Sequence, residues 1–162
     1  TKKADKPYTL SLVVVHHKSG RDFNCQRESE ALQIVDLLEK RASEEPEVNL
    51  VVLGDFNASP SAKSVAVYKD AGFKNAYEQR WEKSGNTRDL FRTHESNRAI
   101  DYIMLHPNAW AEVVPESFQV VGTLHPGSDY NWRTDEPPSG YAADHYPLAI
   151  DVTPRDRSAR RN

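Results

Sequence analysis

The chain has 162 residues, of which 38% are hydrophobic and 28% are charged, and these proportions are typical of one globular domain. Its 21 basic and 24 acidic residues give a net charge of −3, which excludes a protein that holds nucleic acid by a strongly basic surface alone. A polyanionic substrate therefore requires local positive charge plus a metal. The single cysteine, Cys25, excludes a disulfide framework and a zinc cluster built on thiolates.

No stretch approaches the roughly 18–20 apolar residues of a membrane helix, and the first residues do not lead into a signal-peptide run. The first apolar segment begins so close to Thr1 that we expect the N-terminus to be incomplete. Localisation therefore stays open between the cytoplasm and an extracytoplasmic compartment.

Five segments have the apolar composition of β-strands. The first two are nearly continuous runs of valine and leucine, as in strands that are covered on both faces. The last segment alternates apolar and polar residues, as a half-buried strand does. The predicted strands are residues 9–15, 48–53, 100–105, 118–121 and 146–152.

Two helices are predicted between the early strands. The first spans 27–40, because its apolar residues recur at three- and four-residue spacing. The second spans 62–71: Ser59 and Pro60 supply an N-cap and an initial proline, and Gly72 supplies the stop. Strands that alternate with helices early and follow one another later predict an α/β domain with a mixed sheet.

Polar motifs follow or interrupt several of these strands. Taken singly each has a structural explanation; Gly-Asp at the end of a strand, for example, often forms a turn fixed by the aspartate. Read in order, however, four segments resemble the C-terminal motifs of the endonuclease/exonuclease/phosphatase superfamily. They are His16-His17-Lys18-Ser19, Gly54-Asp55-Phe56-Asn57, Arg98-Ala99-Ile100-Asp101-Tyr102-Ile103 and Asp144-His145-Tyr146-Pro147.

The resemblance runs from about residue 10 to residue 152. It departs from the family pattern at His17, where the family has leucine, and at Ala143, where it has serine. Arg27 and Gln33 loosely match an arginine and a glutamine on the exposed side of the family's helix. The family's N-terminal half, which carries an asparagine and a metal-binding glutamate, has no counterpart before Tyr8.

The resemblance therefore implies half of a four-layer α/β sandwich: a mixed β-sheet with helices on its outer face, over residues 8–153. Residues 154–162 are predicted to be a basic, flexible tail, with Arg155, Arg157, Arg160 and Arg161. A half sandwich leaves an apolar sheet face uncovered, which monomers rarely do. We expect the missing N-terminal half of the domain, or self-association, to cover that face.

The activity implied by the resemblance is divalent-metal-dependent hydrolysis of a phosphoester with Mg2+ or Mn2+. The implied catalytic residues are His16, Asp55, Asn57, Asp101 and His145. The implied metal ligands are Asp144, Asp55 and Asn57, and the implied phosphate-binding residues are Lys18 and Arg98. Asp101 is expected to pair with His145, and the choice of Asp55 or His145 as the base stays open.

A nuclease or phosphodiesterase, with nucleic acid as a possible substrate, is the leading interpretation. The alternatives within the family are a phosphomonoesterase such as an inositol phosphatase, and a sphingomyelinase-like enzyme. The alternative of another class is a non-catalytic interaction module that lost the metal glutamate. Several residues outside the motifs are interpreted as structural or surface residues: His94, His106, His125, and the loop aromatics Tyr130, Trp132 and Tyr141.

Overall fold

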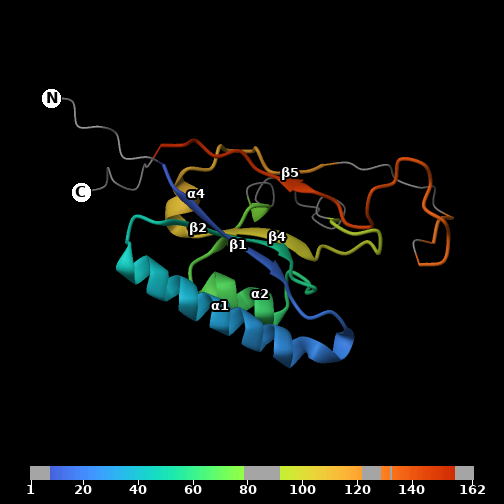
Figure 1. The fold of residues 1–162 in the computed structure, drawn as a ribbon, viewed down its shortest axis with the longest axis horizontal. Coiled ribbons are helices and arrows are strands. Elements are labelled where there is room, and N and C mark those ends of the chain that lie inside the picture. Colours follow the sequence, from blue (N-terminus) through green and yellow to red (C-terminus); the bar gives the residue numbers. More distant parts are fainter. Residues whose placement is uncertain (1–7, 79–91, 122–128, 132, 156–162) are drawn as a thin grey trace.

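The computed structural model describes residues 8–78, 92–121, 129–131 and 133–155 (Figure 1). Its main sheet has four strands in the order β1-β2-β4-β3, and a separate ribbon pairs β5 with β6. β1 and β2 are parallel, whereas β4 is antiparallel to both β2 and β3. The strands are β1 (Leu10–His16), β2 (Asn49–Asp55), β3 (Lys74–Asn75), β4 (Asp101–Leu105), β5 (Gln119–Val120) and β6 (Leu148–Ala149). The prediction of an α/β fold with a mixed sheet is confirmed.

Two helices, α1 (Asn24–Glu44) and α2 (Lys63–Asp70), pack side by side on one face of the sheet (Figure 1). The stripe of α1 that faces inward consists of apolar residues at helical spacing and is buried, as the sequence predicts: Ala31, Val35 and Leu38. A single 3-10 turn, η1 (Arg21–Phe23), leads into α1, and a short helix, α4 (Pro107–Ala111), follows β4.

The core lies between the sheet and these two helices. Residues of β2 and β4 that point toward the helices are fully buried, including Val52, Tyr102 and Met104. Phe56, directly after β2, stacks edge-on against Tyr102 and against Tyr68 of α2, with ring centroids 5.1 and 5.3 Å apart. Aromatic packing therefore fixes the end of β2, where the polar motif begins.

The opposite face of the sheet is partly uncovered. It lines a mostly apolar cavity of about 570 Å³ together with the segment from His145 to Val152. At the edge of this face, Leu12 and Val14 of β1 are 55% and 73% exposed. The helices therefore cover one face only, as expected for half of a sandwich.

Both predicted helices have different boundaries in the structure. α1 extends beyond residues 27–40 at both ends, and Arg27, expected on its exposed side, is buried because backbone carbonyls accept its hydrogen bonds. α2 starts at Lys63, so the prediction of a serine cap at Ser59 is wrong. The Ala62 N–H instead donates to the Ser59 carbonyl and closes a turn before the helix.

The last predicted strand is also shorter than expected. Within 146–152 only Leu148 and Ala149 pair with β5, while Val152 makes an isolated bridge to Val113. The short elements β3 and α4 were not predicted. His125, Trp132, Arg157, Arg160 and Arg161 lie outside the described residues. No helix in the described part of the chain is both long and apolar enough to span a membrane.

Candidate active site

The sheet topology brings three predicted site residues into one row. β1 and β2 are parallel and end at the same edge, where His16 is the register partner of Asp55. β4 runs in the opposite direction and begins at this edge, so that Asp101 is the partner of Asp55 on the other side. The row His16, Asp55 and Asp101 therefore crosses three adjacent strands.

Gly54 permits the close approach of β1 and β2 next to this row. Its φ angle is 131°, and a Cβ atom at this position would lie 2.1 Å from the carbonyl oxygen of Val15. No side chain fits at that distance, so this position requires glycine. The glycine of the motif is thus explained by packing, and it fixes the backbone that carries Asp55.

Asn57 orients the Asp55 carboxylate. It has a left-handed backbone, with φ 47°, and its N–H donates to Asp55 Oδ1 at 2.7 Å. Its side-chain Nδ2 donates to Asp55 Oδ2 at 2.8 Å and to the His17 carbonyl at 3.0 Å. Both amide protons are used within the chain, so Oδ1, an acceptor, is the group of Asn57 available to a ligand.

Asp101 and His145 form the predicted pair. The Nδ1 atom of His145 lies 2.9 and 3.1 Å from the two carboxylate oxygens of Asp101, and Thr93 Oγ1 donates to Asp101 Oδ2 at 2.7 Å. Burial raises the pKa of the Asp101 carboxyl, whereas the hydrogen bonds from Thr93 and His145 lower it. An ionised Asp101 requires a proton on Nδ1, which leaves the His145 Nε2 lone pair to accept a proton.

Asp55, Asp101 and His145 each offer one ligand atom, and these atoms lie within 4.8 Å of one another. Two carboxylates are suitable ligands for Mg2+ or Mn2+. Asp144 belongs to a different group, with His94 and His145. Among the described residues, no such group of acidic and histidine ligands contains both Asp144 and Asp55, so the structure does not bring these two predicted metal ligands together.

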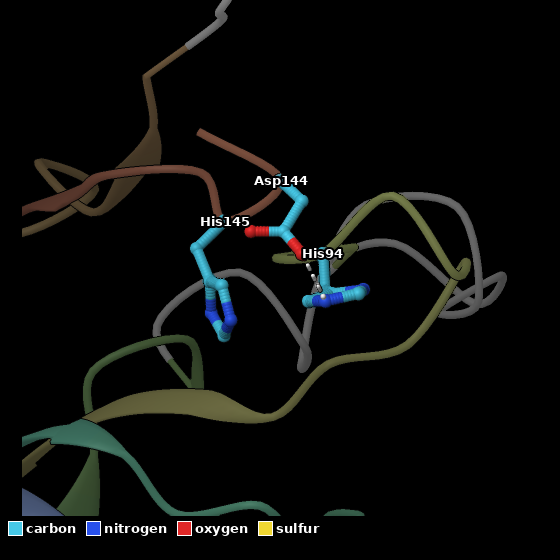
Figure 2. Close-up of side chains that lie close together, drawn as sticks. All are labelled: His94, Asp144 and His145. Carbon is cyan, nitrogen blue, oxygen red and sulfur yellow. Dashed lines mark ion pairs between the residues drawn. The ribbon is translucent and has the colours of Figure 1, made fainter. Parts of the chain in front are cut away.

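His94 is a site residue that the sequence analysis missed. Figure 2 shows it beside Asp144 and His145, with its Nε2 atom 3.3 Å from Asp144 Oδ2. Its ring meets the His145 ring edge-on at 4.6 Å. Its Nδ1 accepts the Ser96 N–H at 2.9 Å, so the neutral ring carries its proton on Nε2. Burial lowers the pKa of His94, and His145 contributes in the same direction. The Nε2 side of the His94 ring therefore faces the Asp144 carboxylate and packs beside it.

Backbone pairing between two loops places these residues together. The Tyr146 N–H donates to the Thr93 carbonyl at 2.8 Å, and the Glu95 N–H donates to the Asp144 carbonyl at 2.9 Å. His94 and His145 are thus opposite each other in an antiparallel bridge. No local sequence pattern predicts a contact between segments about fifty residues apart, so His94 could not be assigned to the site from its own surroundings in the sequence.

The other predicted site residues differ in their surroundings. The His16 side chain is 76% exposed, with Nε2 3.6 Å from Asp55 Oδ2. Lys18 Nζ lies 4.7 Å from the centre of the Phe23 ring, so its ammonium packs on η1. Arg98 Nε donates to Ser96 Oγ at 2.9 Å.

His17, which replaces the family's leucine, is buried behind the row. Its Nδ1 lies 3.0 Å from Glu30 Oε2 and its Nε2 lies 3.0 Å from the Tyr68 hydroxyl. Both partners are on the helices, so His17 fastens the end of β1 to α1 and α2. The predicted structural role of the loop aromatics is supported for Tyr130 and Tyr141, whose rings pack at 5.7 Å.

The sequence matches the model of the endonuclease/exonuclease/phosphatase family over residues 4–145, and the chain belongs to this family. No curated protein sequence matches it.

Solved structures with a similar fold include D. rerio TDP2 humanized by 14 mutations, at 19% identity and a TM-score of 0.57 over 88% of this chain and 55% of that chain. D. rerio TDP2 complexed with a single-strand DNA product matches at 18% identity and 0.52, over 86% and 54%. The human Nocturnin catalytic domain with bound sulfate matches at 17% identity and 0.54, over 86% and 47%. The chain thus spans about half the length of these structures.

Proposed function

We propose that this chain supplies the Asp–His half of the active site of a divalent-metal-dependent phosphoesterase, acting as a nuclease or phosphodiesterase. The observation that carries the proposal is the Asp101–His145 pair, whose ligand atoms lie within 4.8 Å of that of Asp55. A histidine with a free lone pair can activate water as a general base, and carboxylates can hold the divalent cation that offsets charge at a phosphoryl centre.

The steps assigned to this chain's residues follow from their hydrogen bonds. Asp101 holds the His145 ring with Nε2 as the free nitrogen. That atom takes a proton from the attacking water as the new P–O bond forms. In the alternative, His145 is protonated and donates from Nε2 to a phosphoryl oxygen while Asp55 takes the proton of the water. The P–O bond to the leaving group then breaks, and the leaving oxygen receives a proton from the protonated His145 or from solvent water.

A bound Mg2+ or Mn2+ would neutralise phosphoryl charge and lower the pKa of water. The carboxylates of Asp55 and Asp101 are fit for such an ion, with Asn57 Oδ1 as a neutral oxygen donor nearby. We assign Asp144 to the site as well. Its carboxylate lies beside His94 and does not belong to the ligand group that contains Asp55. Exposed His16 is assigned to the phosphoryl oxygens.

Two observations favour a phosphodiester substrate. The edge of the sheet that carries the site is open, since the side chains of His16 and His145 are both accessible. A TDP2 structure with a similar fold contains a single-strand DNA product. An inositol phosphatase, a sphingomyelinase and a non-catalytic module are the competing functions, and substrate choice distinguishes them.

We further propose that the uncovered sheet face docks the N-terminal half of the same family domain. The chain spans about half the length of similar structures, and the exposed Leu12 and Val14 lie on the face that the helices leave open. The complete active site would then combine residues of this chain with those of the missing half.

The test uses the full-length protein with bis(p-nitrophenyl) phosphate, p-nitrophenyl phosphate, sphingomyelin and a single-stranded oligonucleotide. We expect turnover of bis(p-nitrophenyl) phosphate and of the oligonucleotide with Mg2+ or Mn2+ and none in EDTA, whereas preferred turnover of sphingomyelin or of p-nitrophenyl phosphate would favour the corresponding competing function. His145→Ala should lower kcat by roughly 10²–10⁴-fold, the range of general acid–base catalysis. His106→Ala is the matched control, because His106 follows the opposite end of β4 and packs on Phe73. Full turnover by folded His145→Ala, or turnover in EDTA, would refute the mechanism.

A further inference from the structure

A second, polar pocket lies beside the candidate active site. It has a volume of about 630 Å³, and Asn57 is one of its lining residues. The described residues that line it include four arginines and no aspartate or glutamate: Arg21, Arg27, Arg98 and Arg133. In a chain whose net charge is −3, this is a strong local excess of positive charge.

Arg27 contributes charge to the pocket without an acidic partner among the described residues. It is 4% exposed, and its guanidinium donates to three uncharged oxygens: the Lys18 carbonyl at 2.7 Å, the Gly20 carbonyl at 2.8 Å and Asn24 Oδ1. Its buried Nε has no hydrogen-bond partner among the described atoms. An arginine is always protonated, and buried charges are normally paired. The unpaired charge of Arg27 raises the potential in the pocket.

The other three guanidiniums reach the pocket from separate segments. Arg21 belongs to η1, Arg98 precedes β4, and Arg133 comes from the loop before β6. All three are exposed, and the bond from Arg98 Nε to Ser96 Oγ at 2.9 Å holds that side chain against the lining. Cations that converge from three segments onto one polar hollow are suited to a compact anion. Guanidinium groups match phosphate in particular, through paired N–H donors.

We infer that this pocket binds a second phosphate group of the substrate, next to the phosphate that is hydrolysed. Asn57 connects the pocket with the candidate active site, because it lines the pocket and its side chain also donates a hydrogen bond to Asp55. The inference rests on the proposed phosphoesterase function for its substrate, but the anion site itself does not depend on that function. The favoured substrate is a diester whose neighbouring phosphate is a terminal monoester or the next diester of a strand.

The first experiment measures anion binding without catalysis. The full-length protein in EDTA is titrated with inorganic phosphate, followed by calorimetry and by the side-chain Nε–H NMR signal of Arg27. We expect this signal to shift on binding. Arg21→Gln/Arg98→Gln should weaken phosphate binding at least about tenfold, since two charged donors are lost. Lys40→Gln/Arg155→Gln is the control, with the same change of net charge at two exposed positions outside the pocket.

The second experiment compares three substrates with Mg2+: d(TpT), d(pTpT) and d(TpTpT). We expect kcat/KM to be higher for the substrates with an additional phosphate, and Arg21→Gln/Arg98→Gln to remove most of that advantage. An advantage for d(pTpT) alone assigns the pocket to a terminal phosphate, and an equal advantage for d(TpTpT) assigns it to a strand.

The two proposals fail in different ways. If no substrate is hydrolysed while phosphate shifts the Arg27 signal, the anion site stands and the phosphoesterase function falls. If phosphate leaves that signal unchanged, or if the control variant loses as much affinity as Arg21→Gln/Arg98→Gln, the anion site is refuted. Hydrolysis with equal kcat/KM for all three substrates refutes the second-phosphate assignment.

Discussion

Thr93→Val tests the hydrogen-bond network that supports the Asp–His pair. The hydroxyl of Thr93 donates to Asp101 Oδ2 at 2.7 Å and accepts the N–H groups of Ile100 at 3.0 Å and Asp101 at 3.1 Å. Thr93 is 2% exposed, so water cannot replace these bonds. Valine keeps the shape and removes all three. A buried N–H left without an acceptor costs about 1–3 kcal/mol, and we expect a total loss of about 2–4 kcal/mol.

The loss of stability should also depend on pH. Burial raises the pKa of Asp101 above its ordinary value of 3.8, while the Thr93 hydroxyl lowers it. Removal of the hydroxyl therefore raises the folded-state pKa further. A carboxyl with a raised pKa destabilises the fold once ionised, as pH rises from the unfolded pKa through the folded one. The difference between wild type and Thr93→Val should accordingly be larger at pH 7 than at pH 4.

Urea denaturation at both pH values measures this difference. Thr93→Ser is the matched control, because it keeps the hydroxyl and loses one methyl, which costs about 1 kcal/mol. The reasoning is refuted if Thr93→Ser is as unstable as Thr93→Val, since packing would then explain the effect. A loss of the same size at pH 4 and pH 7 would contradict the role of the hydroxyl in keeping Asp101 ionised.

Two shorter predictions concern the sheet. Gly54→Ala should prevent correct pairing of β1 and β2 and lower the free energy of unfolding by at least about 3 kcal/mol, because its Cβ would lie 2.1 Å from the Val15 carbonyl oxygen. Gly140→Ala has open space around it and should cost only about 1–2 kcal/mol, because its backbone is left-handed. Circular dichroism during thermal unfolding distinguishes the two. Val14→Lys should reduce self-association of this chain in light scattering, whereas Leu37→Lys, at a similarly exposed apolar position on α1, should not. Equal effects of the two substitutions would mean that the sheet face is no docking surface.

The central part of the fold follows from local sequence. Valine-rich runs form β1 and β2, and each strand ends where polar residues begin, so Asp55 and His16 are placed at the sheet edge by chain direction alone. The family motifs then add Asp101 and His145, whose hydrogen bond the structure contains. The strands were predictable because composition and spacing act within a few residues, whereas the pairing of Asp101 with His145 was implied by the family resemblance alone.

The misplaced residues depend on contacts across the fold. The sequence predicts Arg27 on an exposed helix face, since spacing does not reveal that carbonyl oxygens of the preceding loop accept hydrogen bonds from its guanidinium. The sequence indicates only a surface or structural role for His94, since the pairing of its loop with Asp144–Tyr146 is what brings it to the site. The two-residue strands β5 and β6 are too short for a periodic signal.

Net charge is a poor guide to what this sheet edge can bind. A chain at −3 has no general attraction for a polyanion, and the sequence therefore requires local charge plus a metal. The structure separates negative and positive side chains at this edge: carboxylates gather at Asp55 and Asp101, and arginines gather in the neighbouring pocket that Asn57 helps to line. A cation suits the first group and a phosphate suits the second. A metal-assisted reaction on a substrate with several phosphates requires such adjacent sites of opposite charge. The net charge of the chain reveals neither the carboxylate site nor the arginine pocket.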